Sequence, residues 1–245
     1  MKKIIFWTAL ISILGLLIGA CSKRSAEDAT TAFVESCDDT TASGSITIGS
    51  DTVSGTYLVQ TWTDSSLSRK ATGCQATTTY YGSPTGTQSV LVKRIVTSST
   101  SFADYEGFYS DTACTSRLGY VEKRYSNVSV GDQVSGLDTS SGRPSSGYKV
   151  TYNGKCGTIM GDTDAATAAF NSSESGNLKL ELLTTGTEKV FSLGFVAGQL
   201  GSTNYSIWGA GDNGTTYSFY SARGGSAGYE PSDWDANSGA STYQR

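Results

Sequence analysis

The sequence contains no histidine in 245 residues. This absence excludes catalysis by a Ser-His-Asp or Cys-His arrangement, and it excludes metal and haem sites that depend on an imidazole ligand. There is also no CxxC pair of the kind found in zinc ribbons and thioredoxin-like redox sites. We therefore expect no catalytic residue, no metal site and no cofactor.

Long apolar runs are scarce as well, and only the first twenty residues contain one. Lys2 and Lys3 precede Ile4–Ile18, which is almost entirely apolar. This run is shorter than the ~20 residues that a membrane-spanning helix needs. A positive start, a short apolar stretch and small residues after it are typical of a secretory signal peptide, so residues 1–20 are predicted to be removed.

The residues Ile18-Gly19-Ala20-Cys21 resemble the lipobox of bacterial lipoproteins. The resemblance implies cleavage before Cys21, a diacylglycerol thioether on its sulfur and usually an acyl group on its new amine. Several chains are needed for a stable anchor, because each buried CH₂ contributes only ~0.8 kcal/mol. Ser22 after the cysteine implies an outer-membrane address in the bacterial cell envelope. An ordinary signal peptide followed by a chance cysteine is the alternative.

The mature chain is acidic and suits a single β domain. Removing residues 1–20 leaves 225 residues and, with Lys2 and Lys3 gone, changes the net charge from −4 to −6. An acidic chain without a basic patch argues against a nucleic-acid partner. The scarcity of proline, with 3 residues, and the abundance of glycine, with 29, accompany many Thr, Ser, Tyr and Val residues, which favours strands and turns.

Four cysteines remain beside the lipidated Cys21. An even number in an exported protein predicts two disulfides, and the sequence alone allows three pairings. These cysteines are Cys37, Cys74, Cys114 and Cys156.

Short runs that suit strands, separated by turn residues, fill most of the mature chain. They are Ser45–Ile48, Thr56–Trp62, Gln75–Tyr81, Ser89–Thr97, Phe102–Tyr109, Leu118–Ser126, Tyr148–Tyr152, Leu178–Leu183, Lys189–Val196, Asn204–Trp208 and Thr216–Ser221. Short helices are predicted over Ala26–Ser36 and Asp164–Asn171. The fold class is therefore all-β, a single antiparallel meander barrel of about ten strands, because closure removes exposed strand edges. A β-sandwich is the alternative.

The predicted organisation has four parts. Residues 1–20 are the signal peptide, 21–36 the lipidated tether with a short helix, 37–223 the β-barrel domain and 224–245 an irregular tail. Turn residues predict a reversal at Asn153-Gly154, a hairpin at Asn213-Gly214 and a mobile loop over Ser135–Gly147. In the tail, Tyr229, Pro231 and Trp234 are candidates to pack back on the domain.

The segment Tyr109-Ser110-Asp111-Thr112-Ala113-Cys114 ends a strand in a Tyr-x-Asp-x-x-Cys pattern. This pattern, with Cys74 forty residues upstream, resembles small lipocalin-like bacterial lipoproteins. The resemblance implies that Cys74 pairs with Cys114, which leaves Cys37 with Cys156. It also implies that the carboxylate of Asp111 accepts backbone N–H groups in the turn.

Other carboxylates and aromatics are weaker candidates for chemistry. Asp162-x-Asp164 and Asp212-Asn213-Gly214 lack the remaining ligands of a calcium loop, so capping and turn roles are preferred. Asp38-Asp39 and the Asp104/Glu106 pair are the carboxylates that a glycan hydrolase could use. The aromatic residues either pack in the core or line a pocket, with packing preferred. They are Tyr80, Tyr81, Tyr105, Phe108, Tyr109, Tyr217, Phe219 and Tyr220.

Together these observations predict a membrane-anchored cell-envelope lipoprotein that is not an enzyme. It would bind a small amphipathic ligand or an envelope partner, and its partners would include the membrane through the anchor but no nucleic acid. The alternatives are a carboxylate-dependent glycan hydrolase and a surface adhesin or structural lipoprotein. The ligand-binding residues and the oligomeric state cannot be named from the sequence.

Overall fold

The computed structural model describes residues 37, 40–63, 68–70, 74–76, 83–139, 144–173, 182–191, 203–212, 217–221, 232–234 and 241–244. The chain separates into two units, Met1–Glu35 and Ser36–Arg245, and every described residue belongs to the second. The predicted leader, Cys21 and the helix predicted over Ala26–Ser36 therefore lie outside the described residues.

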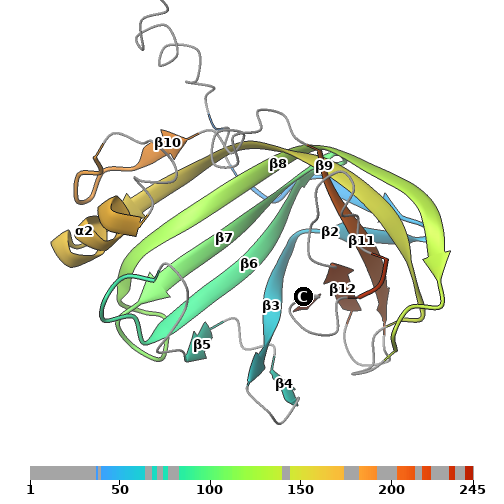
Figure 1. The fold of residues 1–245 in the computed structure, drawn as a ribbon, viewed down its shortest axis with the longest axis horizontal. Helices are drawn as coiled ribbons and strands as arrows, with labels where there is room; N and C mark the ends of the chain where they lie inside the picture. The colour runs from blue at the N-terminus through green and yellow to red at the C-terminus, as the bar shows by residue number, and fades with distance from the viewer. Residues whose placement is uncertain are drawn as a thin grey trace, which may run out of the picture. The chain divides into compact units, whose positions relative to one another are not determined.

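The described residues form mostly antiparallel β-strands (Figure 1). The strands before the helix are β1 (Ser45–Ile48), β2 (Asp51–Ser54), β3 (Thr56–Thr63), β4 (Ser68–Lys70), β5 (Cys74–Ala76), β6 (Ser89–Ser98), β7 (Ser101–Tyr109), β8 (Arg117–Ser135) and β9 (Ser146–Gly161). The helix α2 (Asp164–Ser173) is followed by β10 (Lys189–Phe191), β11 (Thr203–Asp212), β12 (Tyr217–Ser221) and β13 (Ser241–Gln244). The prediction of a largely antiparallel β domain is confirmed.

Two sheets contain these strands. β1 and β2 form a hairpin of their own, and the larger sheet has the order β4-β3-β13-β12-β11-β9-β8-β7-β6-β5, with β10 added beside β9. β3 has partners on both sides, since Thr56–Leu58 pairs with β6 and Leu58–Gln60 pairs with β13. β8 and β9 are the longest strands and run together as a curved ribbon (Figure 1).

The register places one apolar row of side chains on a common face, because directly opposite residues of an antiparallel pair share a face. Val96 lies opposite Phe102, which lies opposite Tyr125. The Phe102 ring stacks on Tyr125 with 4.7 Å between ring centroids and meets Trp208 edge-on at 5.2 Å. These rings join the β1–β2 hairpin, whose Ile46, Ile48 and Val53 are buried in the same cluster.

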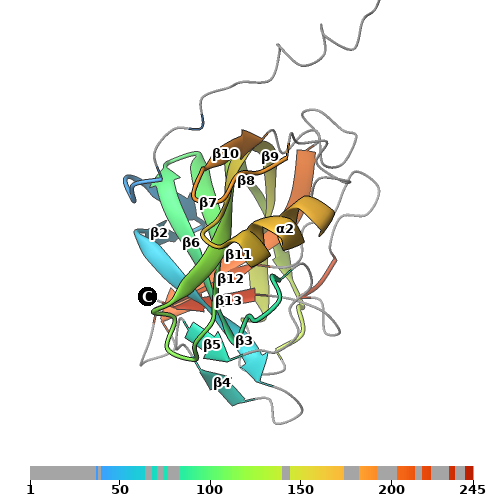
Figure 2. The ribbon, with the colours of Figure 1, turned by 90° about the vertical axis from the view of Figure 1, so that its left-hand side faces the viewer.

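A second cluster on this face lies where α2 packs against the sheet. Phe170 of α2 is 1 % exposed, and its ring centroid lies 5.8 Å from that of Phe108 on β7. Val121, Ile159 and Phe191 belong to the same cluster. Figure 2 views the fold from the side on which α2 lies.

The helix α2 confirms the prediction made for Asp164–Asn171. The hydroxyl of Thr163 accepts a hydrogen bond from the N–H of Ala166 at 3.2 Å, which is an N-cap interaction. Asp164 places a carboxylate in the first turn, where the helix dipole favours negative charge. No helix in the described part of the chain has the length and apolar character needed to cross a membrane.

Several strand predictions are confirmed with small changes at their ends, and β11 and β12 form the predicted hairpin. Asp212 pairs with Tyr217 at its closed end, while the turn residues 213–216 lie outside the described residues. β2 and β4 were not predicted. Three further predicted strands lie mostly outside the described residues: Gln75–Tyr81, Leu178–Leu183 and Lys189–Val196. Of the second, Leu182 and Leu183 are described and are not in a strand.

The turn predicted at Asn153-Gly154 is wrong, because β9 continues through it. Asn153 is paired on both sides, with Ser126 of β8 and Thr203 of β11. The loop predicted over Ser135–Gly147 is shorter, since Ser135 ends β8, Ser146 begins β9 and the N–H of Leu137 donates to the Ser145 carbonyl. Pairing on both edges outweighs local turn propensity here.

The prediction of an irregular tail over residues 224–245 is wrong for Ser241–Gln244, which forms β13 between β12 and β3. The packing expected of Trp234 is confirmed: it is 1 % exposed and its Nε1 donates to the Pro144 carbonyl at 2.8 Å. Tyr229 and Pro231 lie outside the described residues.

Candidate functional site

A pocket of about 160 Å³ lies where the segment before β1 passes the closed end of the β6–β7 hairpin and the middle of β8 and β9. Seven residues from five parts of the chain line it: Thr40, Thr97 of β6, Ser101 and Phe102 of β7, Arg124 and Tyr125 of β8, and Lys155 of β9. All seven are described residues.

The segment that carries Thr40 is fixed at both ends. Cys37 forms a disulfide with Cys156 of β9, with 5.9 Å between their Cα atoms. At the other end, the N–H of Ser43 donates to the Val96 carbonyl at 3.0 Å, and its hydroxyl donates to the Thr97 carbonyl at 2.6 Å. Thr40 is therefore held against the sheet as one wall of the pocket.

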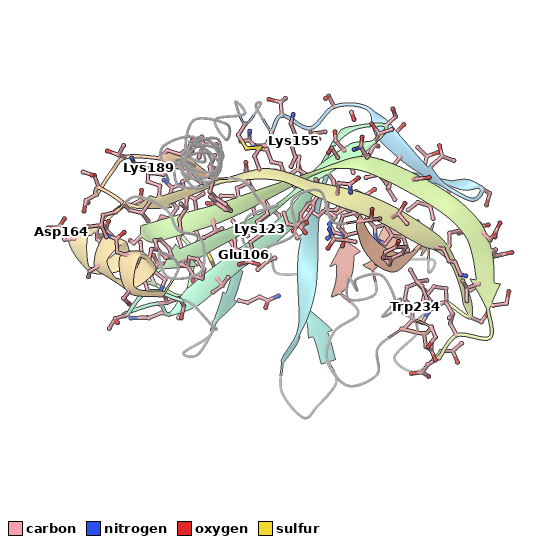
Figure 3. All side chains as sticks on the ribbon, turned by 45° about the horizontal axis from the view of Figure 1, so that its top comes forward. Glu106, Lys123, Lys155, Asp164, Lys189 and Trp234 are labelled. Atoms are coloured by element: carbon pink, nitrogen blue, oxygen red, sulfur yellow. A yellow bond between two sulfur atoms is a disulfide. The ribbon has the colours of Figure 1, made fainter. Side chains whose placement is uncertain are left out.

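A β-bulge brings Lys155 to the pocket. Arg124 lies opposite Cys156, whereas its neighbour Tyr125 lies opposite Gly154, so Lys155 is the extra residue on β9. A bulge changes the direction of the side chains beside it. Lys155 of β9 therefore lines the pocket together with two consecutive residues of β8, Arg124 and Tyr125. Figure 3 shows Lys155 beside a disulfide at this position.

Arg124 is held in place by Glu122. Its Nε and Nη2 donate to Oε1 of Glu122 at 3.0 and 2.8 Å, and Thr40 Oγ1 donates to the other carboxylate oxygen at 3.1 Å. The side chains of Arg124 and Glu122 are only 14 % and 9 % exposed. Among the described residues, the buried Nη1 of Arg124 has no hydrogen-bond partner. A guanidinium fixed by one carboxylate thus retains an unused donor.

The rest of the wall combines hydroxyls and rings. Ser101 Oγ lies 2.8 Å from Thr97 Oγ1 and 2.6 Å from Ser98 Oγ, so these hydroxyls form a short chain. Phe102 and Tyr125 add stacked rings. Burial raises the pKa of Tyr125 well above its ordinary value, which keeps the phenol neutral. The pocket therefore offers cations and hydroxyls beside an aromatic surface.

The predicted Asp104/Glu106 pair lies elsewhere, on the common face of β7. Both oxygens of Asp104 accept hydrogen bonds from Arg94, at 2.6 and 2.7 Å. The register places Lys123 opposite Asp104 and next to Glu106 on the same face (Figure 3). Charges of both signs gather here, which differs from the two facing carboxylates of a glycosidase.

Asp111 organises the turn between β7 and β8, as the resemblance implies. Its carboxylate accepts hydrogen bonds from the N–H groups of Ala113 at 2.7 Å, Ser116 at 2.5 Å and Thr115 at 3.2 Å. Desolvation raises the pKa of Asp111, but these backbone hydrogen bonds outweigh it and lower the pKa to about 2. The disulfide Cys74–Cys114, with 5.8 Å between Cα atoms, closes the same turn. Both disulfides have the pairing that the resemblance implies.

The predicted calcium-like positions have structural partners. Asp162 binds the guanidinium of Arg117 at 2.6 and 3.1 Å, and Asp164 accepts a hydrogen bond from Thr185 at 2.7 Å. Among the residues that the structure describes, no group of three or more His, Cys, Asp or Glu side chains is suited to hold a metal ion. Asp38, Asp39 and the Asn213-Gly214 turn lie outside those residues.

The described aromatics of the sequence prediction are packing residues. Tyr105 stacks on Tyr120 with 5.5 Å between centroids, and Tyr105 and Tyr109 are each less than a tenth exposed. Phe108 is buried against α2. Tyr80 and Tyr81, and the side chains of β12, lie outside what the structure describes. None of the three described rings, Tyr105, Phe108 and Tyr109, lines the pocket.

Sequence reasoning missed Arg124, Lys155 and Thr40. They lie far apart in the chain, and only the disulfide and the bulge bring them together. The one signal in the sequence was Cys156 directly after Lys155, which predicts that any partner of this cysteine also lies near the lysine.

Comparison with known proteins finds no family model that matches this chain and no match among curated proteins.

Proposed function

We propose that this chain is a lipid-anchored protein of the bacterial cell envelope that binds a small ligand in the pocket beneath Thr40 and catalyses no reaction. The lipobox-like Ile18–Cys21 supports the anchor. The observation that carries the proposal is the Cys37–Cys156 disulfide, which joins the segment that follows the anchor to the strand beside the pocket. Disulfides of this kind persist in oxidising compartments outside the cytoplasm.

The strand pairing supports closure of the sheet into a barrel. Following hydrogen-bonded neighbours from β6 through β7, β8, β9, β11, β12 and β13 leads to β3, and β3 pairs with β6 again. A closed path of this kind leaves no free edge along those strands, which protects an exported protein from edge-to-edge association. Hydrogen exchange of the β3 amides tests this: a barrel protects both those facing β6 and those facing β13.

The size of the pocket limits the ligand. A volume of about 160 Å³ is below the ~300–1,000 Å³ typical of sites that enclose a drug-sized molecule. The pocket therefore suits the polar end of a small amphipathic molecule, with the rings of Phe102 and Tyr125 beside it.

The carboxylates support a role without catalysis. A glycan hydrolase needs one carboxylic acid that stays protonated near neutral pH. Asp111 has a pKa of about 2, and Asp104 is paired with Arg94. We expect the parent protein to show no turnover of peptidoglycan fragments, and charge-to-amide changes at Asp104, Glu106 and Asp111 to change nothing in that assay. Turnover by the parent protein that these changes abolish would favour the hydrolase instead.

Intact mass of the full-length product made in a bacterial host tests the anchor. We expect a species that has lost residues 1–20 and gained the mass of a diacylglycerol and a further acyl chain, and a Cys21→Ala variant that gains neither. A product that keeps Met1, or one trimmed but without acyl mass on Cys21, would contradict the proposal.

A further inference from the structure

The two disulfides differ in how accessible their cysteines are. Cys74 and Cys114 are both partly exposed, and Cys114 lies between exposed residues in the turn from β7 to β8. In the other disulfide Cys37 is partly exposed, but Cys156 is 1 % exposed within β9. Access to the sulfurs is one of the factors that set the rate of thiol–disulfide exchange, so the Cys74–Cys114 bond is the more open to an external thiol.

The backbone of Cys114 has a strained conformation. Its φ is 54°, in the left-handed region that a cysteine rarely adopts and that persists only where the surroundings enforce it. The bond to Cys74 is one restraint. The carboxylate of Asp111 is the other, because it accepts the N–H groups of the residues on either side, Ala113 and Thr115. Opening the disulfide removes the first restraint and relaxes part of the strain, while Asp111 keeps the turn folded.

Each sulfur of this bond also lies beside a polar group that suits the reduced form. Sγ of Cys74 is 3.3 Å from the carbonyl oxygen of Thr112, which accepts a hydrogen bond from a thiol but none from a disulfide. Sγ of Cys114 is 3.2 Å from the hydroxyl oxygen of Ser89. That hydroxyl donates to the Asp111 carbonyl at 2.5 Å and is placed to donate to a thiolate instead. Contacts that stabilise the reduced form make a disulfide easier to reduce.

The strand that carries Cys74 is attached to the end of the larger sheet. Among the described strands, β5 pairs only with β6, at the end of the strand order (Figure 1). The Cys74–Cys114 bond spans 40 residues, against 119 for Cys37–Cys156, so the chain-entropy model gives it the smaller contribution to stability. Release of Cys74 therefore leaves the pairing of β6 with β7, β8 and β9 in place.

We propose that the Cys74–Cys114 bond undergoes reversible thiol–disulfide exchange with an external dithiol, whereas the Cys37–Cys156 bond is structural. One thiolate of the dithiol attacks Sγ of Cys74, the S–S bond breaks, and its electron pair leaves on Sγ of Cys114. The second thiol, as a thiolate, attacks the mixed disulfide, which releases Cys74 and leaves the dithiol as a disulfide. Two electrons pass from the dithiol to the protein, and its two protons end on Cys74 and Cys114. Reduction thus frees β5 from the turn between β7 and β8, a role that goes beyond the binding of a ligand in the pocket.

The test is timed reduction of the folded mature protein by dithiothreitol in neutral detergent. Samples are trapped with N-ethylmaleimide in urea, so that buried thiols are labelled too, and peptide mass spectrometry measures the labelling of each cysteine. We expect Cys74 and Cys114 to be labelled at least about tenfold faster than Cys37 and Cys156, which serve as the control within the same molecules. Return to oxidised glutathione is expected to restore the bond.

Hydrogen exchange of the reduced protein tests the structural consequence. The amides of Cys74–Ala76 are expected to lose protection, while those of β6, β7, β8 and β9 keep theirs. Circular dichroism spectra recorded during reduction establish that the protein remains folded.

Ser89→Ala tests the assignment of Cys114 as the leaving sulfur. Without this hydroxyl the thiolate loses a donor, so reduction of the Cys74–Cys114 bond is expected to be about threefold slower. Ser110→Ala is the matched control, because its hydroxyl lies in the same turn and donates to the Ser116 carbonyl at 3.3 Å. Its rate of reduction is expected to equal that of the parent protein. If Ser89→Ala does not fold, the comparison of the two bonds in the parent protein still decides.

Several results would overturn the proposal. The two bonds are then reduced at equal rates, Cys37–Cys156 opens first, or Cys74–Cys114 opens only as the protein unfolds. Loss of protection throughout β6 to β9 would also overturn it, since the bond would then hold the fold and not β5 alone. A bond that does not form again in oxidised glutathione refutes reversible exchange. Equal rates in Ser89→Ala and Ser110→Ala refute Cys114 as the leaving sulfur.

Discussion

The ion pair between Arg94 and Asp104 yields the sharpest prediction about stability. The two residues lie directly opposite each other on β6 and β7, and the guanidinium contacts both carboxylate oxygens. The side chain of Arg94 is 7 % exposed and that of Asp104 is 21 % exposed. The guanidinium also lies 4.5 Å from the Phe102 ring centroid and 5.5 Å from that of Trp208.

Asp104→Leu would leave this guanidinium in the core without its carboxylate. Breaking a buried pair costs ~3–5 kcal/mol, and the lower end applies because Asp104 is partly exposed, so we expect the free energy of unfolding to fall by about 3 kcal/mol. The double variant Arg94→Met/Asp104→Leu is expected to recover most of this loss, since an apolar pair of similar volume often replaces a buried ion pair without destabilisation.

Urea denaturation followed by circular dichroism and tryptophan fluorescence measures these changes. Asp132→Leu on the exposed part of β8 is the matched control and is expected to alter stability by less than about 0.5 kcal/mol. The reasoning is refuted if Asp104→Leu is as harmless as Asp132→Leu. It is equally refuted if the double variant is as unstable as the single one.

Three further predictions concern the disulfides, the junction with α2 and the behaviour at high pH. In the chain-entropy model the Cys37–Cys156 bond, which spans 119 residues, stabilises by about 5 kcal/mol and the Cys74–Cys114 bond, which spans 40, by about 4. Urea midpoints of the two double Cys-to-Ala variants should therefore rank in that order, and the reverse order would contradict the model. Gly161→Ala places a Cβ 2.7 Å from the N atom of Thr167, so a loss of ~1–3 kcal/mol is expected. In Gly131→Ala, the control, the nearest atom to the new Cβ is 3.6 Å away, so the change should be nearly neutral. Thermal melts of the two glycine variants and the parent protein measure this difference. Burial and the neighbouring Tyr105 raise the pKa of Tyr109 from 10 to about 12, so its contribution to stability is complete below pH 10 and is lost as the pH rises towards 12. Tyr109→Phe should flatten that part of a stability–pH curve, and an unchanged curve would show that Tyr109 does not cause it.

Strands that carry their own pattern could be predicted from the sequence. β6 and β7 have β-branched or aromatic residues along their length, and their predicted bounds differ from the observed ones by one residue at most. Thr163 caps the alanine-rich stretch Asp164–Asn171, and this local signal was also sufficient.

Features that depend on distant pairing could not be predicted. Asn153 and Gly154 suit a turn, yet both lie within β9 because β8 pairs along that stretch. Instead of a turn, β9 has a bulge at Lys155, and β8 has a separate irregularity where Asn127 adopts a positive φ of 55°. The pocket depends on the β9 bulge at Lys155 and on a disulfide that spans 119 residues, so apart from Cys156 beside Lys155 nothing in the local sequence distinguishes these two cations, Arg124 and Lys155.

The place of β13 in the sheet has a consequence for biogenesis. The strand that separates β3 from β12 comes after all the others in chain order, whereas β3 is among the first. A chain that emerges from its N-terminus exposes an unsatisfied β3 flank until synthesis reaches residues 241–244. We therefore expect the sheet to be completed only after residues 241–244 have been synthesised, and the β3 flank to be open to edge-to-edge association until then.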